Sequence, residues 1–480
     1  MSPKMHSAEV STIYLFNLVV GAGALALPLA FALTGWVLGI IAIIILSVMS
    51  FITATFMVEA MSISNAIVRW QMIASRRNKQ ANGDIEHTLS HPDLIVNCEE
   101  ASLLPDQSSQ VDPDAPCYNI KDKMEMGQMA KLLFNRIGIN LFYIVIALYL
   151  YGDLAIYAAA VPKSLTRVLC MHVKPSNNST SAEDLCFKSI SKEGVYRLNV
   201  LAFTLVLGPF VFFDLGKTKY MQIATTVLRW LAFILMIALA LYGIERHKNR
   251  GNAPVFNLSK LPNFFGVSVY SFMCQHSLPS ILTPTKQKNR MNMILTTSYS
   301  AISAFYLLLT LTAVFCFPVE KLNDIYTLNF LDSWPGFAYF LALFPVFTLS
   351  SNFPIIAITL RENIKSIFQR EGKSCSAIVD RIVFPLVTIL PPIAVAFVTQ
   401  DVEMLVGVTG SYAGSIIQYV IPVTLVFCGR KQARKLFGSY VNKHRSIFRH
   451  RWWIFFVIVW TVLCIGLVTV QHFLDLFDKN

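Results

Sequence analysis

Charged residues are scarce in this sequence. Only 14% of the 480 residues are Asp, Glu, Lys or Arg, which is about half the share found in an average soluble domain. Hydrophobic residues make up 55% of the chain, and the mean hydropathy is +0.54. They come in runs of about 20, the length that crosses a hydrocarbon core about 30 Å thick. These proportions exclude a soluble enzyme, a disordered tail protein and a coiled coil, and they favour a multi-pass membrane protein.

Several chemical signatures are also missing. Nine cysteines are too few for a disulfide scaffold, and no CxxC pair suggests a metal site. No GxxxxGK[ST] motif indicates nucleotide-driven transport. The apolar segments hold no His/Asp/Glu cluster and no Ser/His/Asp arrangement, so neither an enzyme nor a cofactor is expected. The net charge of +12 does not indicate nucleic acid, because Lys and Arg also mark the cytoplasmic side of membrane proteins.

Eleven apolar segments are predicted to cross the lipid bilayer. They must be helices, because lipid cannot satisfy the backbone groups of an open strand. The predicted spans are residues 9–33, 36–60, 136–162, 198–214, 221–244, 262–283, 292–316, 337–360, 380–398, 404–428 and 452–472. The predicted fold class is therefore an all-α polytopic membrane protein.

The distribution of basic residues predicts a cytoplasmic amino terminus. Most Lys and Arg then fall on the cytoplasmic side, above all in loop 429–451. The Asn-x-Ser/Thr sequons begin at Asn177, Asn178 and Asn257, in loops that this topology places in the lumen or outside the cell. Glycosylation is therefore expected at these three positions. An odd number of spans places the carboxyl terminus on the same side as the sequons.

Two cysteines, Cys170 and Cys186, flank the first two sequons. A disulfide between them would suit the oxidising compartment that this topology gives to the loop. Two free thiols are the alternative, and the sequence leaves both open.

The long segment 69–131 is predicted to be cytoplasmic. It is polar, contains several prolines and shows no helical period, which predicts a largely disordered loop. Within it, Glu99 followed by Leu103 and Leu104 resembles an acidic dileucine sorting signal. Such signals direct membrane proteins to endosomes and lysosomes through clathrin adaptors. A lysosomal or endosomal membrane is therefore favoured over the plasma membrane.

The first predicted span contains residues that interrupt a helix. Gly21 and Gly23 each lower helix stability by up to about 1 kcal/mol relative to Ala, and Pro28 removes an amide donor. Amides at the start of the second half-helix would form a positive pocket suited to a carboxylate. The carbonyls that end the first half would suit an ammonium group or a sodium ion. The alternative is a small-residue face for helix packing.

The sixth predicted span holds a second polar cluster. Gln275, His276 and Ser277 lie in mid-span, and Pro279 follows. A His inside the membrane is by default a functional hypothesis. The alternative is a buried His that is hydrogen-bonded to a neighbouring carbonyl.

The positions of these two interruptions correspond. Spans one to five, within residues 1–244, match spans six to ten, within 245–428, in the opposite orientation. The remaining segment, 429–480, holds the basic loop and the eleventh span. Paired interrupted segments in two inverted halves are the sequence feature that points most directly to a transporter site.

Two other charged residues lie within spans, and one lies at a span end. Asp153 in span three and Arg229 in span five are candidates for a gate, although their predicted depths argue against a direct ion pair. Arg229 is interpreted as extending to the inner interface. Glu59 is interpreted as a solvated residue at a cytoplasmic helix end.

Particular motifs resemble a known family. Asn-x-x-x-Gly at 17–21, followed by Ala-Leu-Ala-Leu-Pro-Leu-Ala and Gly-Trp at 35–36, resembles the first span of amino acid/auxin permease-type transporters, which include the sodium-coupled neutral amino acid transporters. Residues 272–279 are similar to the Phe-x-Cys-His…Leu-Pro stretch of their sixth span. The insert 69–131 and the sequons are most similar to the transmembrane protein 104 branch. The resemblance implies a sodium-symporter-like 5+5 inverted repeat with helices 1 and 6 broken, plus one extra helix.

The same resemblance implies roles for individual residues. Amides around Ala22 to Ala24 would hold the substrate carboxylate, and carbonyls near each break would take its amine. The implied substrate-binding residues are Asn17, Gly21, Ala22, Gly23, Ala24, Phe272, Cys274, Gln275 and His276. Asn17 with the hydroxyls of Thr348 and Ser351 would bind sodium. Without sodium coupling, His276 is the natural proton carrier, because His titrates in the range that an acidic lumen samples.

The sequence therefore predicts a secondary active transporter of a small, neutral amino acid. It would work by alternating access, driven by sodium or protons. The alternative is an amino-acid sensor on the same fold, which binds without transport and signals through segment 69–131.

Overall fold

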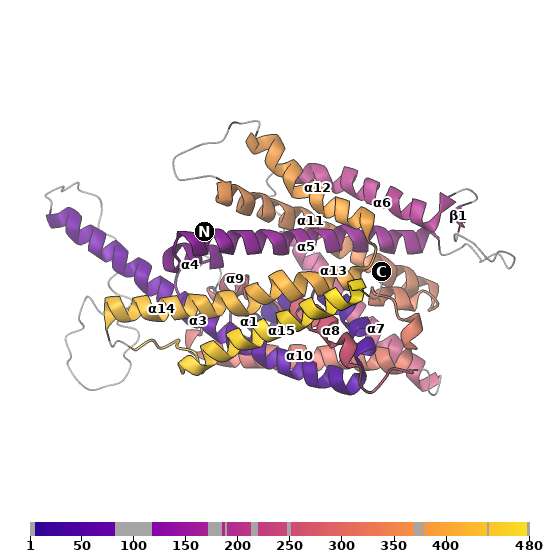
Figure 1. Cartoon of the computed structure of the whole chain (residues 1–480), viewed down its shortest axis with the longest axis horizontal. Coiled ribbons are helices and arrows are strands. Elements are labelled where there is room, and N and C mark those ends of the chain that lie inside the picture. The colour runs from indigo at the N-terminus through magenta and orange to yellow at the C-terminus, as the bar shows by residue number, and fades with distance from the viewer. Residues whose placement is uncertain are drawn as a thin grey trace.

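A computed structural model of the chain describes residues 5–81, 118–170, 185–187, 190–212, 219–246, 251–368, 376, 379–438 and 441–477. These residues form a bundle of long helices that run roughly along one axis (Figure 1). A minimal antiparallel pair of strands, β1 (Leu185–Phe187) and β2 (Ile190–Ser191), lies at one end of the bundle. The expected all-α class is confirmed.

The helices of the described part follow one another with few interruptions. The α-helices are α1 (Ala8–Val19), α2 (Gly23–Thr34), α3 (Trp36–Ala81), α4 (Met126–Leu133), α5 (Arg136–Leu169), α6 (Lys192–Leu207), α7 (Lys219–Arg246), α8 (Leu261–Phe272), α9 (Leu278–Leu282), α10 (Met291–Cys316), α11 (Pro335–Phe368), α12 (Phe384–Val398), α13 (Val402–Thr409), α14 (Ile421–Phe437) and α15 (Arg451–Phe477). Short 3-10 helices are η3 (Gly208–Phe212), η4 (Leu258–Lys260), η5 (Lys288–Arg290), η6 (Val319–Lys321) and η7 (Tyr326–Phe330). Segments η8 (Val379–Val383), η9 (Gly410–Gly414) and η10 (Ile416–Val420) have π-helical turns.

Nine helices among the described residues are long and apolar enough to cross a membrane, and the bent pair α1–α2 makes a tenth. The predicted sixth span corresponds to α8 and the five-residue α9, a pair that does not meet the same length criterion. The predicted count of eleven spans is therefore not confirmed. The π-helical turns of η9 and η10 join α13 to α14 within a single span, Val402–Phe437.

The loop that was predicted to be disordered, 69–131, includes helical residues at both of its ends. Helix α3 continues to Ala81, because the residues after the apolar run are good helix formers. Helix α4 buries Met126, Met129, Ala130 and Leu133. That spacing gives one apolar face at helical period, which the sequence analysis did not recognise. Residues 82–117 lie outside the described part of the chain, and with them the candidate sorting residues Glu99, Leu103 and Leu104.

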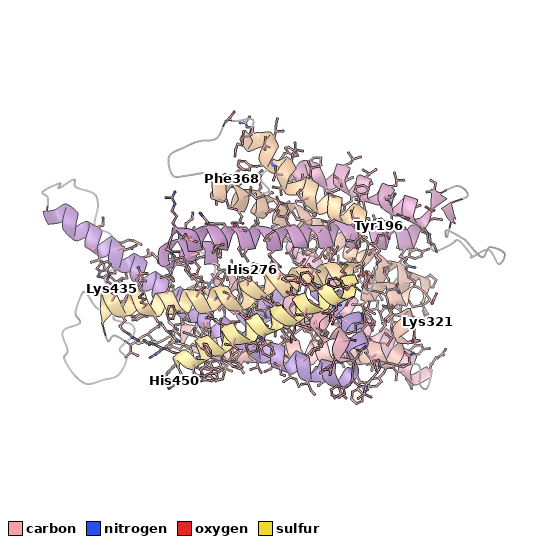
Figure 2. The ribbon with its side chains drawn as sticks, in the orientation of Figure 1. Tyr196, His276, Lys321, Phe368, Lys435 and His450 are labelled. Carbon is pink, nitrogen blue, oxygen red and sulfur yellow. A yellow bond between two sulfur atoms is a disulfide. The ribbon has the colours of Figure 1, made fainter. Side chains whose placement is uncertain are left out.

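The two ends of the bundle carry different features. Figure 2 shows Lys435 and His450 toward one end, Tyr196 and Lys321 toward the other, and His276 between them. The amino-terminal residues lie toward the first end and the carboxyl terminus toward the second (Figure 1).

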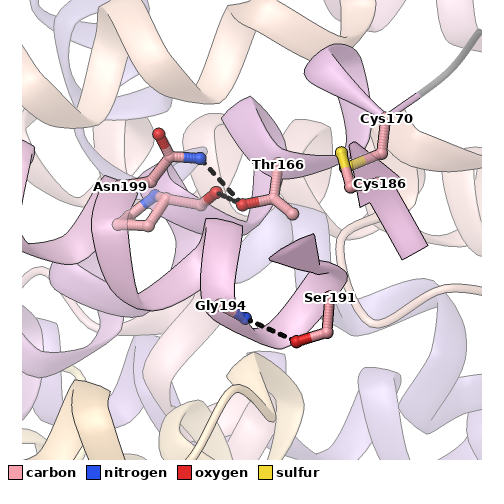
Figure 3. Close-up of a disulfide and its surroundings, with 7 residues drawn as sticks. Thr166, Cys170, Cys186, Ser191, Gly194 and Asn199 are labelled. Atoms are coloured by element: carbon pink, nitrogen blue, oxygen red, sulfur yellow. Dashed lines mark hydrogen bonds between the residues drawn. A yellow bond between two sulfur atoms is a disulfide. The ribbon is translucent and has the colours of Figure 1, made fainter. Parts of the chain in front are cut away.

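The end that holds Tyr196 contains a disulfide. Cys170 follows α5 and is joined to Cys186 of β1, with a Cα–Cα distance of 5.0 Å (Figure 3). Nearby, Ser191 caps α6 by accepting a hydrogen bond from the Gly194 amide at 3.1 Å. Of the two alternatives left open for these cysteines, the structure has the disulfide. The sequons at Asn177 and Asn178 lie outside the described residues.

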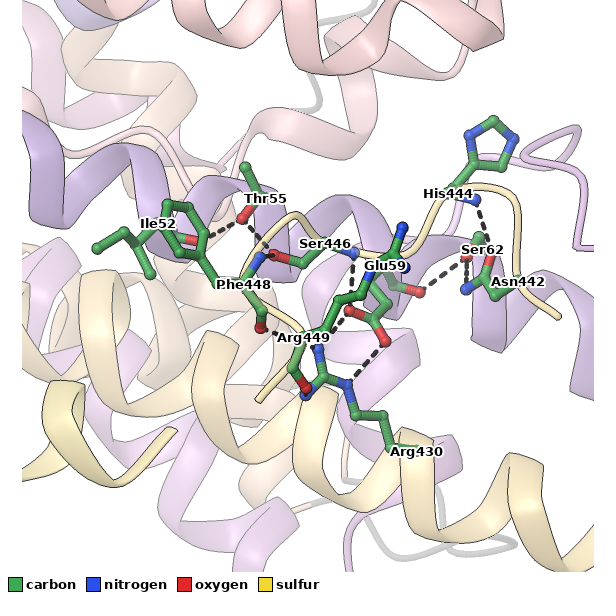
Figure 4. Close-up of polar contacts among 10 residues, drawn as sticks. All are labelled: Ile52, Thr55, Glu59, Ser62, Arg430, Asn442, His444, Ser446, Phe448 and Arg449. Atoms are coloured by element: carbon green, nitrogen blue, oxygen red, sulfur yellow. Dashed lines mark hydrogen bonds and ion pairs between the residues drawn. The ribbon is translucent and has the colours of Figure 1, made fainter. Parts of the chain in front are cut away.

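The opposite end contains a buried ion pair between α3 and α14. Both carboxylate oxygens of Glu59 accept hydrogen bonds from Arg430, at 2.8 and 2.7 Å, and one also accepts from the Ser446 amide at 3.0 Å (Figure 4). Glu59 is only 2% exposed. The interpretation of Glu59 as a solvated residue is wrong, because α3 continues past it and segment 441–450 covers it.

Candidate functional site

The first membrane-crossing segment is interrupted, as predicted. Helix α1 ends at Val19 and α2 begins at Gly23, and the two axes differ by 63°. Gly21 lies in the gap and Gly23 begins α2, and both have low helix propensity, so the chain leaves the helix there at little cost. Pro28 lies inside α2 and not at the gap. The prediction that Pro28 helps to interrupt the helix is therefore wrong, and the glycines account for the break.

The sixth segment is interrupted as well. Helix α8 ends at Phe272, and α9 begins at Leu278. Met273 adopts an extended conformation that ends α8. Pro279 lies in the first turn of α9, where a missing amide hydrogen is not a loss. Both expected interruptions are confirmed.

The two interrupted segments lie antiparallel to each other. At one end, the Asn257 amide that precedes α8 donates to the carbonyl of Thr34 in α2 at 2.8 Å. At the other end, the His6 amide before α1 donates to the Pro284 carbonyl after α9 at 2.9 Å, and the Lys286 amide donates back to His6 at 2.9 Å. Antiparallel pairing of the two breaks is the arrangement that an inverted repeat requires.

Glycines let these helices approach to backbone contact. A Cβ atom on Gly23 would lie 2.5 Å from the Ser271 hydroxyl oxygen and 2.8 Å from its Cα. A Cβ atom on Gly410 of η9 would lie 1.9 Å from the carbonyl oxygen of Gly266 in α8. Helix α8 is therefore held against α2 on one side and η9 on the other by residues without side chains.

A cavity of about 680 Å³ adjoins both interruptions. Residues from α1, α2, α5, α7, α8 and α11 line it, with the α8–α9 gap and α9. The lining reaches from Gly21 at the first break to His6 and Pro284, near the end of the bundle that holds the amino terminus. The cavity therefore extends from the middle of the bundle toward that end.

Two opposite charges line this cavity. Among the described residues that line the cavity, Asp153 of α5 is the one carboxylate, and Arg229 of α7 is the one Arg or Lys. Asp153 is only 5% exposed, and its Oδ1 atom has no hydrogen-bond partner among the described residues. The same holds for Nδ1 of His276, whose ring centroid lies 5.7 Å from that of Tyr149. Leaving a buried polar atom unpaired costs about 1–3 kcal/mol, so these two atoms mark where a polar ligand would be satisfied.

The carbonyls at the end of α1 already have partners. Nη1 of Arg229 donates to the carbonyl oxygens of Asn17 and Val20, at 2.7 and 3.0 Å. The Tyr306 hydroxyl lies 3.2 Å from the Val19 carbonyl and 2.8 Å from that of Ser271. Arg229 therefore binds the broken helix instead of extending to the membrane interface, and the earlier interpretation of this residue is wrong.

The predicted sodium ligands have protein partners in this arrangement, and not all of them line the cavity. The Asn17 side-chain oxygen accepts a hydrogen bond from the indole of Trp230 at 2.6 Å. The Thr348 hydroxyl lines the cavity but donates to the Phe344 carbonyl at 2.8 Å. The Ser351 hydroxyl lies outside the lining and donates to the Thr348 carbonyl at 2.9 Å. The Arg229 guanidinium stands where the cation was expected.

The structure brings together some of the predicted substrate-binding residues. Those that line the cavity are Asn17, Gly21, Ala22, Gly23 and His276, whereas Ala24, Phe272, Cys274 and Gln275 lie outside its lining.

The outlying side chains have other partners. The Gln275 amide nitrogen donates to the Thr53 hydroxyl of α3 at 3.1 Å, and its oxygen accepts from the Cys274 amide at 3.0 Å. The Cys274 thiol contacts the Tyr299 hydroxyl at 3.2 Å. These side chains hold the second break against α3 and α10, which differs from their expected contact with a ligand.

Some residues of the site were not anticipated in their present roles. Asp153 and Arg229 were recognised as charges inside the membrane, but as gates. Tyr306 and Trp230 were not recognised, because the sequence around a Tyr or Trp in an apolar run does not indicate which carbonyl or amide will be its hydrogen-bond partner.

The end of the bundle away from the cavity is closed by polar contacts. Lys163 of α5 forms an ion pair of 2.6 Å with Asp324 and donates to the Gln400 carbonyl at 2.8 Å. The same oxygen of Asp324, Oδ2, also accepts a hydrogen bond from the Val402 amide at 2.9 Å. These bonds join α5 to the loop before η7 and to the start of α13.

Comparison with known proteins agrees with this geometry. A family model described as transmembrane amino acid transporter protein matches residues 5–74 and 117–469. The chain belongs to this family. The match covers both interrupted segments and every helix that lines the cavity, and it omits residues 75–116.

Full-length relatives carry one name. The chain is 48% identical to transmembrane protein 104 of Gallus gallus, over 98% of this chain and 97% of that protein. It is 46% identical to transmembrane protein 104 of Homo sapiens, with the same two coverages. It is 40% identical to the transmembrane protein 104 homolog of Drosophila melanogaster, again over 98% and 97%. The expected family and branch are confirmed.

Proposed function

We propose that this protein moves a small, neutral amino acid across a membrane by alternating access. One observation carries the proposal: an unpaired carboxylate oxygen of Asp153 and the start of helix α2 line the same cavity at the first break. The two features offer a negative and a positive binding site for a zwitterion. Membership of an amino acid transporter family supports a transporter rather than an enzyme.

The α-carboxylate would bind at the turn before α2. Gly21, Ala22 and Gly23 line the cavity, and no described side chain caps this helix start. Uncapped amides at a helix N-terminus favour an anion. A carboxylate placed here would accept hydrogen bonds from the backbone of this turn.

The α-ammonium group would pair with Asp153. The carbonyls of Asn17, Val19 and Val20, which were expected to take the amine, already have Arg229 or Tyr306 within hydrogen-bond distance. Asp153 instead has an oxygen to offer, and a buried carboxylate needs a positive partner. This assignment replaces a set of backbone oxygens with one side chain that mutation can test.

Alternating access would close one end of the cavity and open the other. In the present conformation the lining extends toward the amino-terminal end, while the Lys163–Asp324 pair joins helices at the opposite end. If the amino terminus is cytoplasmic, this conformation faces inward. Segments one, two, six and seven would rock against the others, so that α2 and α8 move together relative to α5 and open the end that is now closed.

An ion gradient, of sodium or protons, would drive the movement. His276 supports the proton alternative, because its Nδ1 lies without a described partner at the cavity. Ion binding would be coupled to substrate transport indirectly, because the bound ion changes the charge of the cavity.

An amino-acid sensor that binds without transport is the second candidate, with segment 69–131 as its signalling region. Purified protein in proteoliposomes distinguishes the two. We expect uptake of a labelled mixture of the twenty amino acids, saturable by unlabelled mixture, and loss of uptake in the Asp153→Asn variant. Saturable binding without uptake would favour the sensor, and absence of both would contradict the proposed site.

The cellular location is proposed to be a lysosomal or endosomal membrane, reached through clathrin adaptors that bind the dileucine segment. The amino terminus would be cytoplasmic, and Asn177, Asn178 and Asn257 would be glycosylated in the lumen. Replacing both Leu103 and Leu104 by Ala should move the protein to the cell surface. An unchanged distribution would exclude the sorting signal.

A further inference from the structure

Helix α1 ends in a position that attracts a cation. The carboxyl end of a helix carries unpaired carbonyls and the negative pole of its dipole. Here those carbonyls face a cavity inside the membrane, where water and lipid cannot replace a missing partner. A transporter with such a break must therefore supply positive charge at this point.

The chain supplies that charge from its own α7. One nitrogen of Arg229, Nη1, lies 2.7 Å from the Asn17 carbonyl oxygen and 3.0 Å from that of Val20. One guanidinium nitrogen has two hydrogens and can donate to both oxygens at once. Because a guanidinium remains protonated in proteins, this charge does not depend on the composition of the solution.

The neighbouring oxygen is also engaged. The Asn17 side chain accepts from Trp230, the residue next to Arg229, at 2.6 Å. The ring of Trp230 stacks on Phe16 of α1 with centroids 4.9 Å apart. Two consecutive residues of α7 thus bind the backbone and side chain of the same residue of α1, which fixes the guanidinium in register with the break.

We infer that Arg229 is a built-in replacement for a sodium ion at the α1 break, so that this protein neither binds sodium there nor needs it. A second cation bound by the same two carbonyl oxygens would lie next to the positive charge of the guanidinium, and repulsion between the two like charges disfavours it. What the inference means for transport rests on the proposed function, because a carrier without this sodium site must be driven by another ion or another site. Its direct consequence concerns ion binding alone.

The first test uses the unmodified protein. Radiolabelled sodium binding and the melting temperature are measured on purified full-length protein, in sodium chloride and in choline chloride of equal ionic strength. We expect no saturable sodium binding and equal melting temperatures in the two salts. Saturable binding of sodium by the unmodified protein would overturn the inference.

The second test removes the guanidinium. Arg229→Ala should melt at a lower temperature in choline chloride, and sodium should raise that temperature and bind saturably, because the oxygens of Asn17 and Val20 become available. Arg229→Lys should restore indifference to sodium. If Arg229→Ala does not fold, Arg229→Gln is measured in its place. A destabilised variant that binds no sodium would contradict a cation site at this break.

A matched control exists on α11. Arg361 is 7% exposed and donates from Nη1 to the carbonyl of Val211 at 2.9 Å, away from either break. Arg361→Ala should also lower the melting temperature, but sodium should not restore it. An equal sodium effect in this variant would show general salt stabilisation and overturn the inference. Since the readouts are ion binding and stability, a protein that binds amino acids without moving them still answers the question.

Discussion

The two interrupted helices differ in what occupies their gaps. At the first gap, Gly21, Ala22 and Gly23 present backbone to the cavity. At the second gap, the Gln275 side chain bonds to the Cys274 amide and to α3, so much of that turn is satisfied by the protein itself. Both gaps have the same origin, a helix that ends in mid-membrane, and neither second half-helix has a side-chain cap. Only at the second gap does a side chain of the turn itself, Gln275, bind a backbone amide of that turn.

This difference suggests a division of labour between the gaps. The first gap is shaped for a ligand, because only glycine and alanine (Gly21 to Gly23) line the cavity at this turn and the nearby carbonyls have partners on α7 and α10. The second gap is anchored and contributes one side chain, His276, to the same cavity. The following substitutions separate ligand binding from stability at each gap, from the largest expected effect to the smallest.

Filling the first gap should abolish ligand binding. A Cβ atom on Gly21 would have the Val19 carbonyl oxygen at 3.8 Å as its one described neighbour within 4 Å, and Gly21 has no positive φ. Gly21→Leu therefore extends into the cavity without disturbing the fold. We expect no measurable uptake of labelled amino acids in proteoliposomes and a melting temperature close to that of the unmodified protein.

Gly466 in α15 provides the control for this substitution. No described atom lies within 4 Å of a Cβ placed there, and the residue does not line the cavity. Gly466→Leu should leave uptake unchanged. Full uptake by Gly21→Leu would contradict the assignment of the ligand to the first gap.

Removing the negative charge opposite the first gap should weaken binding strongly. Asp153→Asn should cost about 2 kcal/mol or more, the usual loss when one member of a buried charge pair is removed, or roughly thirtyfold in Kd. Glu403 is a matched control, because it is a buried acid that accepts a hydrogen bond from Asn263 and lies outside the cavity lining. Glu403→Gln should leave Kd unchanged; equal losses in both variants would indicate a structural role for Asp153.

Neighbouring glycines of the first gap should respond differently to the same change. Gly23→Ala places a Cβ atom against Ser271 and should lower stability by about 1–3 kcal/mol, the usual cost of overpacking. Gly21→Ala should change stability by less than about 1 kcal/mol. Thermal denaturation in detergent measures both, and equal effects would contradict the close contact between α2 and α8.

Removing the anchor of the second gap should affect stability but not affinity. Gln275→Ala leaves the Cys274 amide and the Thr53 hydroxyl without their partner, which should cost about 1 kcal/mol. Ligand affinity, measured by the same uptake competition, should stay within about twofold. A large loss of affinity at full stability would assign Gln275 to the ligand after all.

Much of the fold follows from local properties of the sequence. Apolar runs locate the long helices, and Gly21 and Gly23 mark the first break because their low helix propensity acts at their own position. The side-chain partners of the break were not predictable in the same way. Arg229 and Tyr306 meet α1 only after helices more than 200 residues apart in sequence pack together.

The second gap illustrates the same limit. Gln275 and His276 are adjacent and both polar, and the sequence gives no reason to separate them. The fold turns Gln275 toward α3 and leaves His276 at the cavity. Asp153 was recognisable as an unusual charge within a span. Whether its Oδ1 atom has a hydrogen-bond partner, however, depends on which groups surround it after packing.

Ligand protection of a single position tests the central claim most directly. Gly21→Cys is treated with a maleimide, with and without a mixture of the twenty amino acids, and compared with Gly466→Cys. The partly exposed cysteines Cys316, Cys428 and Cys464, together with Cys98, Cys117 and Cys375, are first replaced by Ser, whereas Cys274 is buried and Cys170 is in a disulfide. We predict that the mixture slows labelling at position 21 and leaves position 466 unchanged. Equal labelling of position 21 with and without amino acids would contradict a ligand site at the first break.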